Sequence, residues 1–252
     1  MKRTERHQLK ENAVALAVQR AKEAFEIHKQ EYTFAAVGVV VILAAIGGYF
    51  FWRQSVDTSS RALLAAAMAV ADAPVVPPAP PPAPDAKTTA PPAPPPAGSF
   101  PTEKARLEAA LARFTAASDA YPATPAGIAA RYEAAATLAA LGRTAEAVQR
   151  YQEVIDRAPN TIYADTARLG LGEAQMRAGQ YDAAVATFKS VAALKDGRMP
   201  VDGVLMQLGR AYALAGKAAD ARQTFQRIVD EFPQSSYAAL ARKELDAVKT
   251  AG

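Results

Sequence analysis

A fixed spacing of 37 residues runs through the C-terminal part of the chain and constrains its fold more than any other feature. Three kinds of position recur at that spacing: an alanine, an aromatic residue four positions later, and a small or aliphatic residue three positions after that. They are Ala110, Ala147, Ala184 and Ala221; Phe114, Tyr151, Phe188 and Phe225; and Ala117, Val154, Val191 and Ile228. Such a period predicts one supersecondary unit that is repeated and stacked on its neighbours.

Turn residues punctuate the same period. A proline follows three of the four units at the equivalent place, at Pro122, Pro159 and Pro233, whereas the third unit has Asp196 there and a proline only at Pro200. Glycines are expected to end helices in the left-handed conformation, and hydroxyl side chains are expected to cap the helices that follow the prolines. The glycines are Gly142, Gly179 and Gly216, and the capping residues are Thr124, Thr161 and Ser235.

These residues resemble the tetratricopeptide-repeat (TPR) family, in which a small residue, an aromatic residue and a proline mark each helix pair. The last unit matches that pattern best, through Leu205, Leu208, Gly209, Tyr212, Ala221, Phe225 and Pro233. The resemblance implies an α-solenoid of antiparallel helix pairs over residues 102–252, with about three and a half repeats of 37 residues. A polar helix over residues 237–249 would cap its open end.

The composition supports an all-α protein and argues against catalysis. Alanine is abundant and aromatic residues make up only 8% of the chain, which favours closely packed helices. The chain has no cysteine, and both histidines, His7 and His28, precede the repeats, so no Ser-His or Cys-His pair can form there. We therefore expect no enzyme activity, no catalytic residue, no metal and no cofactor. The net charge of +4 is spread too evenly for nucleic-acid binding.

Residues 34–52 form an uncharged apolar run that predicts a transmembrane helix. Its 19 residues would span ~30 Å at ~1.5 Å per residue, and aromatic residues stand at both ends. Seven Lys and Arg residues precede the run, against only Arg53 and Arg61 in the twenty residues after it, which predicts a cytoplasmic N-terminus and an exported C-terminal domain. A buried core helix and a cleaved signal peptide are the alternatives; the run is longer than the ~7–15 residues typical of a signal peptide.

Three further segments complete the predicted organisation. Residues 1–33 are expected to form a short cytoplasmic helix, and residues 53–73 a helix after the membrane. That second helix either packs with the helix after Pro101 or simply continues the membrane helix. Residues 74–101 hold 13 of the 18 prolines, so they are expected to be an extended linker or a long loop.

The layout of a basic N-terminus, one membrane helix and an exported repeat domain resembles the YfgM-like ancillary subunits of the bacterial Sec translocon. The segment FPQSSYAALARKEL also resembles the TPR domain of the cell-division coordinator CpoB. The resemblance implies a single-pass protein of the bacterial inner membrane with a periplasmic scaffold that binds translocon components, chaperones or exported polypeptides. The alternative is a scaffold that coordinates peptidoglycan synthesis, cell division or outer-membrane assembly.

The concave face of a TPR array is lined by the first helix of each pair, and the resemblance places the protein-binding surface there. The corresponding positions carry Tyr132, Leu169, Glu173, Met176, Met206 and Arg210. Their apolar members could form an adaptable groove for unfolded or amphipathic segments. Packing between neighbouring helices is the equal alternative, and the sequence leaves the partner and the oligomeric state open.

Overall fold

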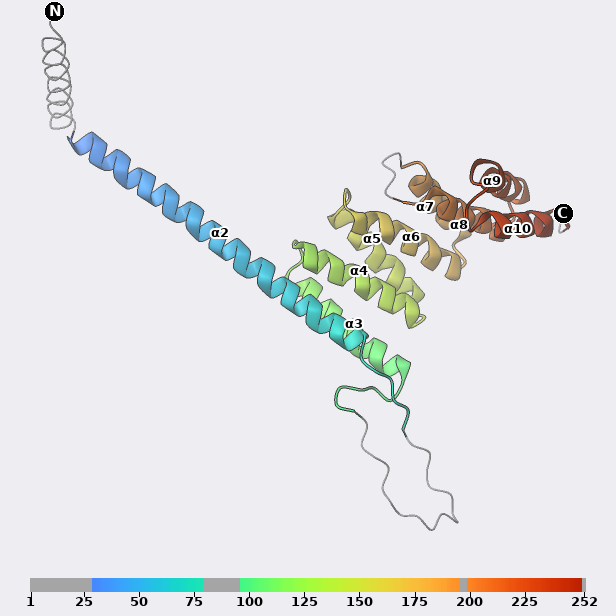
Figure 1. Ribbon diagram of the computed structural model, residues 1–252, viewed down its shortest axis with the longest axis horizontal. Coiled ribbons are helices and arrows are strands. Elements are labelled where there is room, and N and C mark those ends of the chain that lie inside the picture. The colour runs from blue at the N-terminus through green and yellow to red at the C-terminus, as the bar shows by residue number, and fades with distance from the viewer. Residues whose placement is uncertain (1–28, 79–95, 195–198, 251–252) are drawn as a thin grey trace, which may run out of the picture. The chain divides into compact units, whose positions relative to one another are not determined.

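The computed structural model describes residues 29–78, 96–194 and 199–250, and this part of the chain is helical (Figure 1). The helices are α2 (Lys29–Ala71), α3 (Glu103–Ala120), α4 (Pro125–Ala140), α5 (Thr144–Arg157), α6 (Ile162–Arg177), α7 (Tyr181–Ala192), α8 (Val201–Leu214), α9 (Ala218–Glu231) and α10 (Ala238–Thr250). The described residues contain one isolated β-bridge and no strand longer than that. The all-α prediction is confirmed for these residues, whereas the helix expected over residues 1–28 lies outside them.

The chain divides into two units, Met1–Val56 and Asp57–Gly252. In the first unit, residues 29–56 of α2 carry large apolar side chains that nothing covers: Phe34, Phe51 and Trp52 are 76%, 79% and 62% exposed. Among the described residues, only the helical stretch Thr33–Ala71 contains a window long and apolar enough to cross a membrane, and none of that window is buried.

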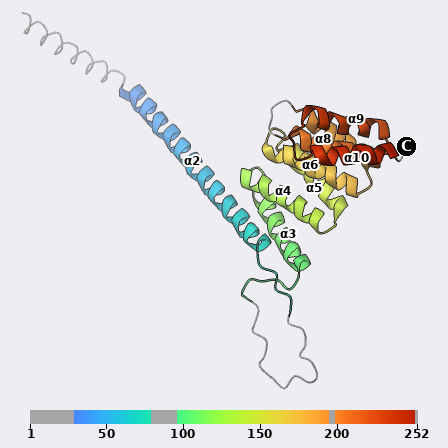
Figure 2. The same cartoon turned by 45° about the vertical axis from the view of Figure 1, so that its right-hand side comes forward.

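The second unit is a series of antiparallel helix hairpins stacked side by side (Figures 1 and 2). Each of the pairs α4–α5, α6–α7 and α8–α9 packs against the next, and α10 packs against α9. The first helices of successive pairs also contact one another directly, α4 with α6 and α6 with α8. These first helices therefore form one continuous layer of the solenoid.

The end of α2 belongs to this second unit. Ala67 is completely buried in a cluster with Ala110, Phe114 and Ala117 of α3, so the residues after Asp57 pack as the first helix of an additional pair. The helix is also continuous from Lys29 to Ala71. One helix thus includes the apolar residues and, after Asp57, the residues that pack with α3.

Both ends of the proline-rich segment lie side by side. The Phe100 amide donates to the Pro74 carbonyl at 2.9 Å, and the Val76 amide donates to the Phe100 carbonyl at the same distance. The Arg106 guanidinium also donates to the Ala73 carbonyl at 3.3 Å. These contacts make the segment a loop between the paired helices α2 and α3; its residues 79–95 lie outside the described part.

The 37-residue columns form the core of the solenoid. The four periodic alanines are fully buried, and the four periodic aromatic residues are at most 5% exposed. Close packing explains the small residues beside them: a Cβ atom added at Gly172 or Gly209 would overlap the ring of Phe188 or Phe225. Helices can approach closely only where the side chain facing the ring is this small.

The predicted turn chemistry is present at the three glycines and at two threonines, whereas Ser235 accepts a hydrogen bond from the Tyr237 amide at 3.0 Å before α10 begins. Gly142, Gly179 and Gly216 have φ of 76°, 74° and 73°, the left-handed conformation of a helix C-cap. Thr124 and Thr161 accept hydrogen bonds from the amides of Gly127 and Ala164. The third loop differs, as its sequence indicates. Pro200 stands immediately before α8, and no side chain accepts a hydrogen bond from the first amides of that helix.

Candidate protein-binding surface

Polar contacts join the first helices of the later repeats across the layer. The Gln207 amide of α8 donates to the Glu173 carboxylate of α6 at 3.4 Å. One repeat further on, the Arg210 guanidinium of α8 contacts the Glu244 carboxylate of α10 at 3.2 Å. In both contacts the partners are 34 residues apart, and the second pair lies one repeat of 37 residues after the first. The same two positions therefore meet in successive repeats, and we call this series of contacts the ladder.

The six residues predicted to line the surface divide into two groups. Glu173 and Arg210 are half-buried members of the ladder. The apolar four pack instead: Leu169 and Met176 are partly buried against the core around Phe225, and Met206 lies inside it at 1% exposure. The Met206 side chain is therefore covered by its neighbours in this structure.

Tyr132 is the fourth apolar residue, and it belongs to an aromatic group between α4, α5 and α6. Its ring centroid lies 6.0 Å from that of Tyr151 and 6.3 Å from that of Tyr163. Burial raises the pKa of the Tyr132 hydroxyl, and the carboxylates of Glu133 and Glu173 raise it further. Tyr151 is the buried member of this group, and Tyr132 and Tyr163 are half-buried.

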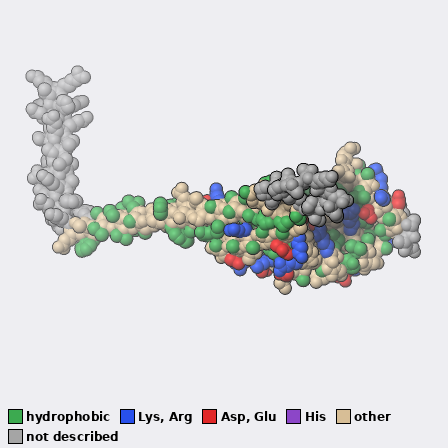
Figure 3. Space-filling model, turned by 90° about the horizontal axis from the view of Figure 1, so that it is seen from below, with side chains coloured by type: hydrophobic (Ala, Val, Ile, Leu, Met, Phe, Trp, Pro, Cys, Tyr) green, Lys and Arg blue, Asp and Glu red, His purple; other side chains and the backbone are tan. Residues whose placement is uncertain are grey.

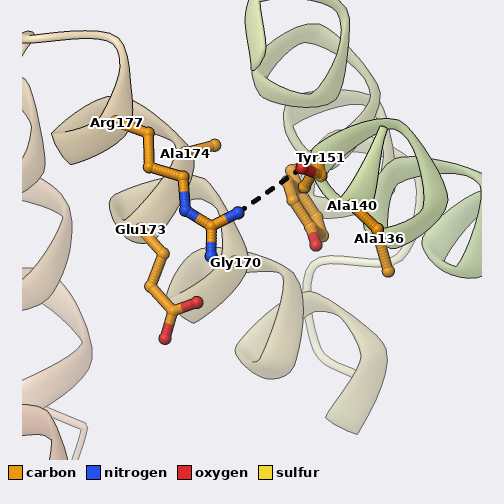
Figure 4. A pocket seen from close by; sticks show the side chains of 8 residues that line it. Ala136, Ala140, Tyr151, Gly170, Glu173, Ala174 and Arg177 are labelled. Carbon is orange, nitrogen blue, oxygen red and sulfur yellow. Dashed lines mark hydrogen bonds between the residues drawn. The ribbon is translucent and has the colours of Figure 1, made fainter. Parts of the chain in front are cut away.

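A pocket of about 230 Å³ opens between α4 and α6. Its walls are the small residues Ala136, Ala139, Ala140, Gly170 and Ala174, together with Tyr151, Glu173 and Arg177. Figure 4 shows Tyr151 of α5, Glu173 and Arg177 around the same space. The Arg177 guanidinium donates to the Ala139 carbonyl at 3.4 Å, which ties α6 to the end of α4 at one side of the pocket.

Sequence reasoning did not find this pocket. It named Glu173 and the neighbouring Tyr132, but it assigned Tyr151 only to the core and gave Arg177 no role. One signal was available in the sequence. Ala136 and Gly170 occupy the two ladder positions one repeat earlier. Alanine carries only a methyl group and glycine has no side chain, so no side-chain contact can form between these positions, and that could have been seen from the period alone.

Burial and charge distinguish the residues near the pocket. Burial is the largest cause of a strongly raised pKa at the Tyr151 hydroxyl, and Tyr132, Glu173 and Glu133 add to it while Arg177 opposes it. On the other side of α4, Arg131 is only 3% exposed and donates to the Ser118 carbonyl at 3.3 Å. Burial, followed by the charge of Arg157, lowers the pKa of Arg131.

The face of the second unit that Figure 3 presents carries charges of both signs. Figure 3 shows Lys and Arg side chains interspersed with Asp and Glu over the face of the second unit that it presents. Among the described residues, no group of three or more His, Asp or Glu side chains is placed to hold a metal ion.

Family comparisons agree with this geometry. Residues 138–200 match the tetratricopeptide-repeat family, and residues 204–235 match a second description of the same repeat. The hairpins within these segments resemble tetratricopeptide repeats. The matched segments begin at the end of α4 and stop in the turn before α10, and they include three of the four residues in each periodic column.

Solved structures share the fold. A Podosopora anserina protein with nearly identical TPR-like repeats, described as a kinesin light chain, is 17% identical, with a TM-score of 0.52 over 59% of this chain and 80% of that one. A tetratricopeptide-repeat protein from Parabacteroides merdae is 18% identical, with a TM-score of 0.50 over 59% of this chain and 56% of that one. At these identities the likeness shows the fold alone. No curated protein matches the chain.

Proposed function

We propose that this chain is a membrane-anchored scaffold whose repeats bind other proteins on the periplasmic side of a bacterial inner membrane. The observation that carries the proposal is the exposed apolar stretch of α2, which continues directly into the first helix of a TPR solenoid. TPR domains bind other proteins, and an apolar helix of this length is stable when lipid covers it. The repeats would then be held close to the membrane surface.

The orientation follows from the charges that flank the apolar run. Basic residues are concentrated before it and sparse after it, so the positive-inside rule places the repeats outside the cytoplasm. An exported scaffold next to the membrane could receive polypeptides as they emerge. We therefore propose that its partners are the Sec translocon, periplasmic chaperones or the exported chains themselves.

The alternative is a scaffold for envelope assembly. The segment 232–245, which resembles the CpoB-type repeat, covers the turn after α9 and the start of α10. In that case peptidoglycan synthases, division proteins or outer-membrane assembly factors would be the partners.

Crosslinking in intact cells, followed by affinity purification of the full-length protein and mass spectrometry, separates the two. Recovery of translocon subunits and periplasmic chaperones supports the export role, and recovery of cell-wall synthases supports the alternative. A chain cut after Val56 keeps the apolar helix and loses the repeats, so it serves as the control. If that control recovers the same proteins, the repeats are not the binding element and the proposal is wrong.

A further inference from the structure

The end of α2 forms one end of the solenoid, and the side that it turns away from α3 is exposed. Each inner first helix lies between two second helices: α4 packs with α3 and α5, α6 with α5 and α7, and α8 with α7 and α9. The end of α2 packs with α3 through Leu64, Ala67 and Val70. No second helix precedes it in the described part of the repeats, and it lies at the opposite end of the stack from α10 (Figures 1 and 2). The place that a preceding second helix would fill is therefore uncovered.

The exposed side of this helix end is apolar, and we call it the α2 face. It consists of six exposed residues: Ala62, Leu63, Ala65, Ala66, Met68 and Ala69. Leu63 and Met68 are the larger two, at 41% and 38% exposure. The terminal units of a solenoid need a polar outer side to remain in water. Because the α2 face has no polar side chain, burying it against another apolar surface is favourable.

The α10 end of the solenoid is built differently. The exposed residues of α10 include Arg242, Lys243 and Asp246. A second copy that stacked its α10 on the α2 face would take these charges out of water and place them against alanine, leucine and methionine, which is costly. Head-to-tail stacking of copies is therefore unfavourable, whereas two α2 faces are compatible with each other.

Charged residues separate the α2 face from the apolar run. Arg53, Asp57 and Arg61 follow Trp52 at intervals of four residues, and the Asp57 carboxylate and the Arg61 guanidinium form an exposed ion pair at 2.8 Å. Charged side chains are costly in the hydrocarbon core of a bilayer. The lipid that covers the apolar run is therefore not expected to extend over the α2 face, which leaves a protein as its cover.

The size of the α2 face favours a partner that is held in the same membrane. A standard interface between independent proteins buries ~800 Å² on each partner, and six side chains, four of them alanine, offer less than that. Tethering two partners to one bilayer raises their effective concentration, so a smaller contact is sufficient. A second copy of this chain meets that condition, because α2 is one continuous helix and every copy has the same apolar run before the same face.

We propose that the α2 face is a homodimer interface, through which two copies pair side by side and make the scaffold bivalent. The proposal rests on the proposed function, because it needs both copies to cross one membrane in the same direction. Their α2 helices then run parallel, and a two-fold axis between them brings each residue of the face opposite its own copy. Ala62 and Ala69 are seven residues apart, which is the repeat of a seam between two parallel helices.

Single cysteines test this interface in native membranes, because the chain has no cysteine of its own. Ala62→Cys and Ala69→Cys would be made separately in the full-length protein, and isolated membranes would be oxidised with copper phenanthroline. A disulfide forms only where two Cβ atoms come within ~3.5–4.5 Å of each other, and the two-fold axis places each cysteine opposite its own copy. We expect most of each variant to run as a disulfide-linked dimer on a non-reducing gel.

Two control variants carry the same membrane helix but have their cysteine away from the α2 face. Ala219→Cys is exposed on α9 and Ala239→Cys is exposed on α10, so both should stay monomeric. Adding Ala65→Glu to Ala69→Cys should abolish most of the dimer, because two like charges would meet in an apolar contact. Ala65 is exposed within one copy, so its fold does not depend on that side chain, and circular dichroism verifies this.

The outcomes separate this proposal from the proposed function. Equal dimer formation in Ala219→Cys or Ala239→Cys would show random collision in the membrane and would overturn the homodimer. Monomers at both Ala62→Cys and Ala69→Cys, or a disulfide to a different protein, would show that a second copy does not cover the α2 face and would also overturn it. In these cases a chain that stays in washed membranes keeps the scaffold role, whereas release of the chain at high pH would contradict both proposals.

Discussion

Single glycines end the first helix of each repeat, and their backbone geometry explains why no other residue recurs there. At Gly216, with φ of 73°, the Lys217 amide donates to the Tyr212 carbonyl at 2.9 Å and the Gly216 amide to the Ala213 carbonyl at 3.1 Å. These two bonds satisfy carbonyls that the end of α8 would otherwise leave free. An L-residue in this conformation costs roughly 1–2 kcal/mol.

Gly216→Ala should therefore lower the free energy of unfolding by about 1 kcal/mol, because Ala is strained at positive φ. Gly203→Ala is the control: Gly203 lies inside α8, where its added Cβ atom would come no closer than 3.3 Å to Tyr237. That change should be neutral or slightly stabilising, since Ala favours helix. Thermal unfolding followed by circular dichroism compares them, and equal midpoints would contradict the strained cap.

At the same scale, the Glu133 carboxylate makes stability depend on pH. Burial raises its pKa, and the nearby charge of Asp72 raises it further. The folded state therefore binds this proton more tightly than the unfolded state does, so stability is lost as pH rises from the ordinary glutamate pKa through the raised one. Above that window the charged carboxylate destabilises the fold.

Glu133→Gln removes that charge, so the unfolding midpoint should rise at pH 7 and the gain should shrink at pH 4. Glu146→Gln is a suitable control, because a hydrogen bond from Arg143 lowers the pKa of Glu146 and gives the opposite sign. Its exposed ion pair contributes little, so that variant should not raise the midpoint at pH 7. Equal midpoints for wild type and Glu133→Gln at both pH values would contradict the buried-charge argument.

The sequence predicted the residues whose role repeats and missed those whose role is local. The alanine and aromatic columns, the left-handed glycines and the capping threonines follow from the 37-residue period and from backbone chemistry. Met206 shows the limit: the period places it on a first helix, but it does not say whether the side chain turns outward or into the core, where the structure places it. The pocket was missed for the same reason, since it depends on two small residues meeting across helices.

At the scale of elements, α2 has two environments along one helix. Its first part exposes large apolar side chains, and its last part buries Ala67 against α3. The sequence left these two roles as alternatives because a helix pattern alone does not locate the end of a membrane segment. Their combination makes the end of α2 part of the repeat fold.

Ala67→Leu should therefore disturb α3, because overpacking a filled core costs ~1–3 kcal/mol. Ala66→Leu adds the same side chain to the exposed face of the same helix and is the matched control. Hydrogen exchange of the α3 amides should become faster in Ala67→Leu and stay unchanged in Ala66→Leu. Exchange in α8 and α9 should not change in either variant, since each repeat contacts only its neighbours. Equal α3 exchange in the two variants would show that α2 does not pack there.

At the scale of the whole molecule, the orientation across a membrane can be tested with the cysteine-free chain itself. The sequence contains no cysteine, so a single introduced cysteine is the only thiol that a maleimide can label. Thr4→Cys marks the N-terminus, and Ala219→Cys marks an exposed position on α9. A membrane-impermeant maleimide added to spheroplasts should label Ala219→Cys and not Thr4→Cys, because the positive-inside rule predicts a cytoplasmic N-terminus. Detergent lysis should make both sites reactive and serves as the accessibility control.

Labelling of Thr4→Cys alone would place the repeats in the cytoplasm, and an export role would then be impossible for them. Release of the protein from washed membranes at high pH would show instead that the apolar stretch of α2 is covered by protein and not by lipid.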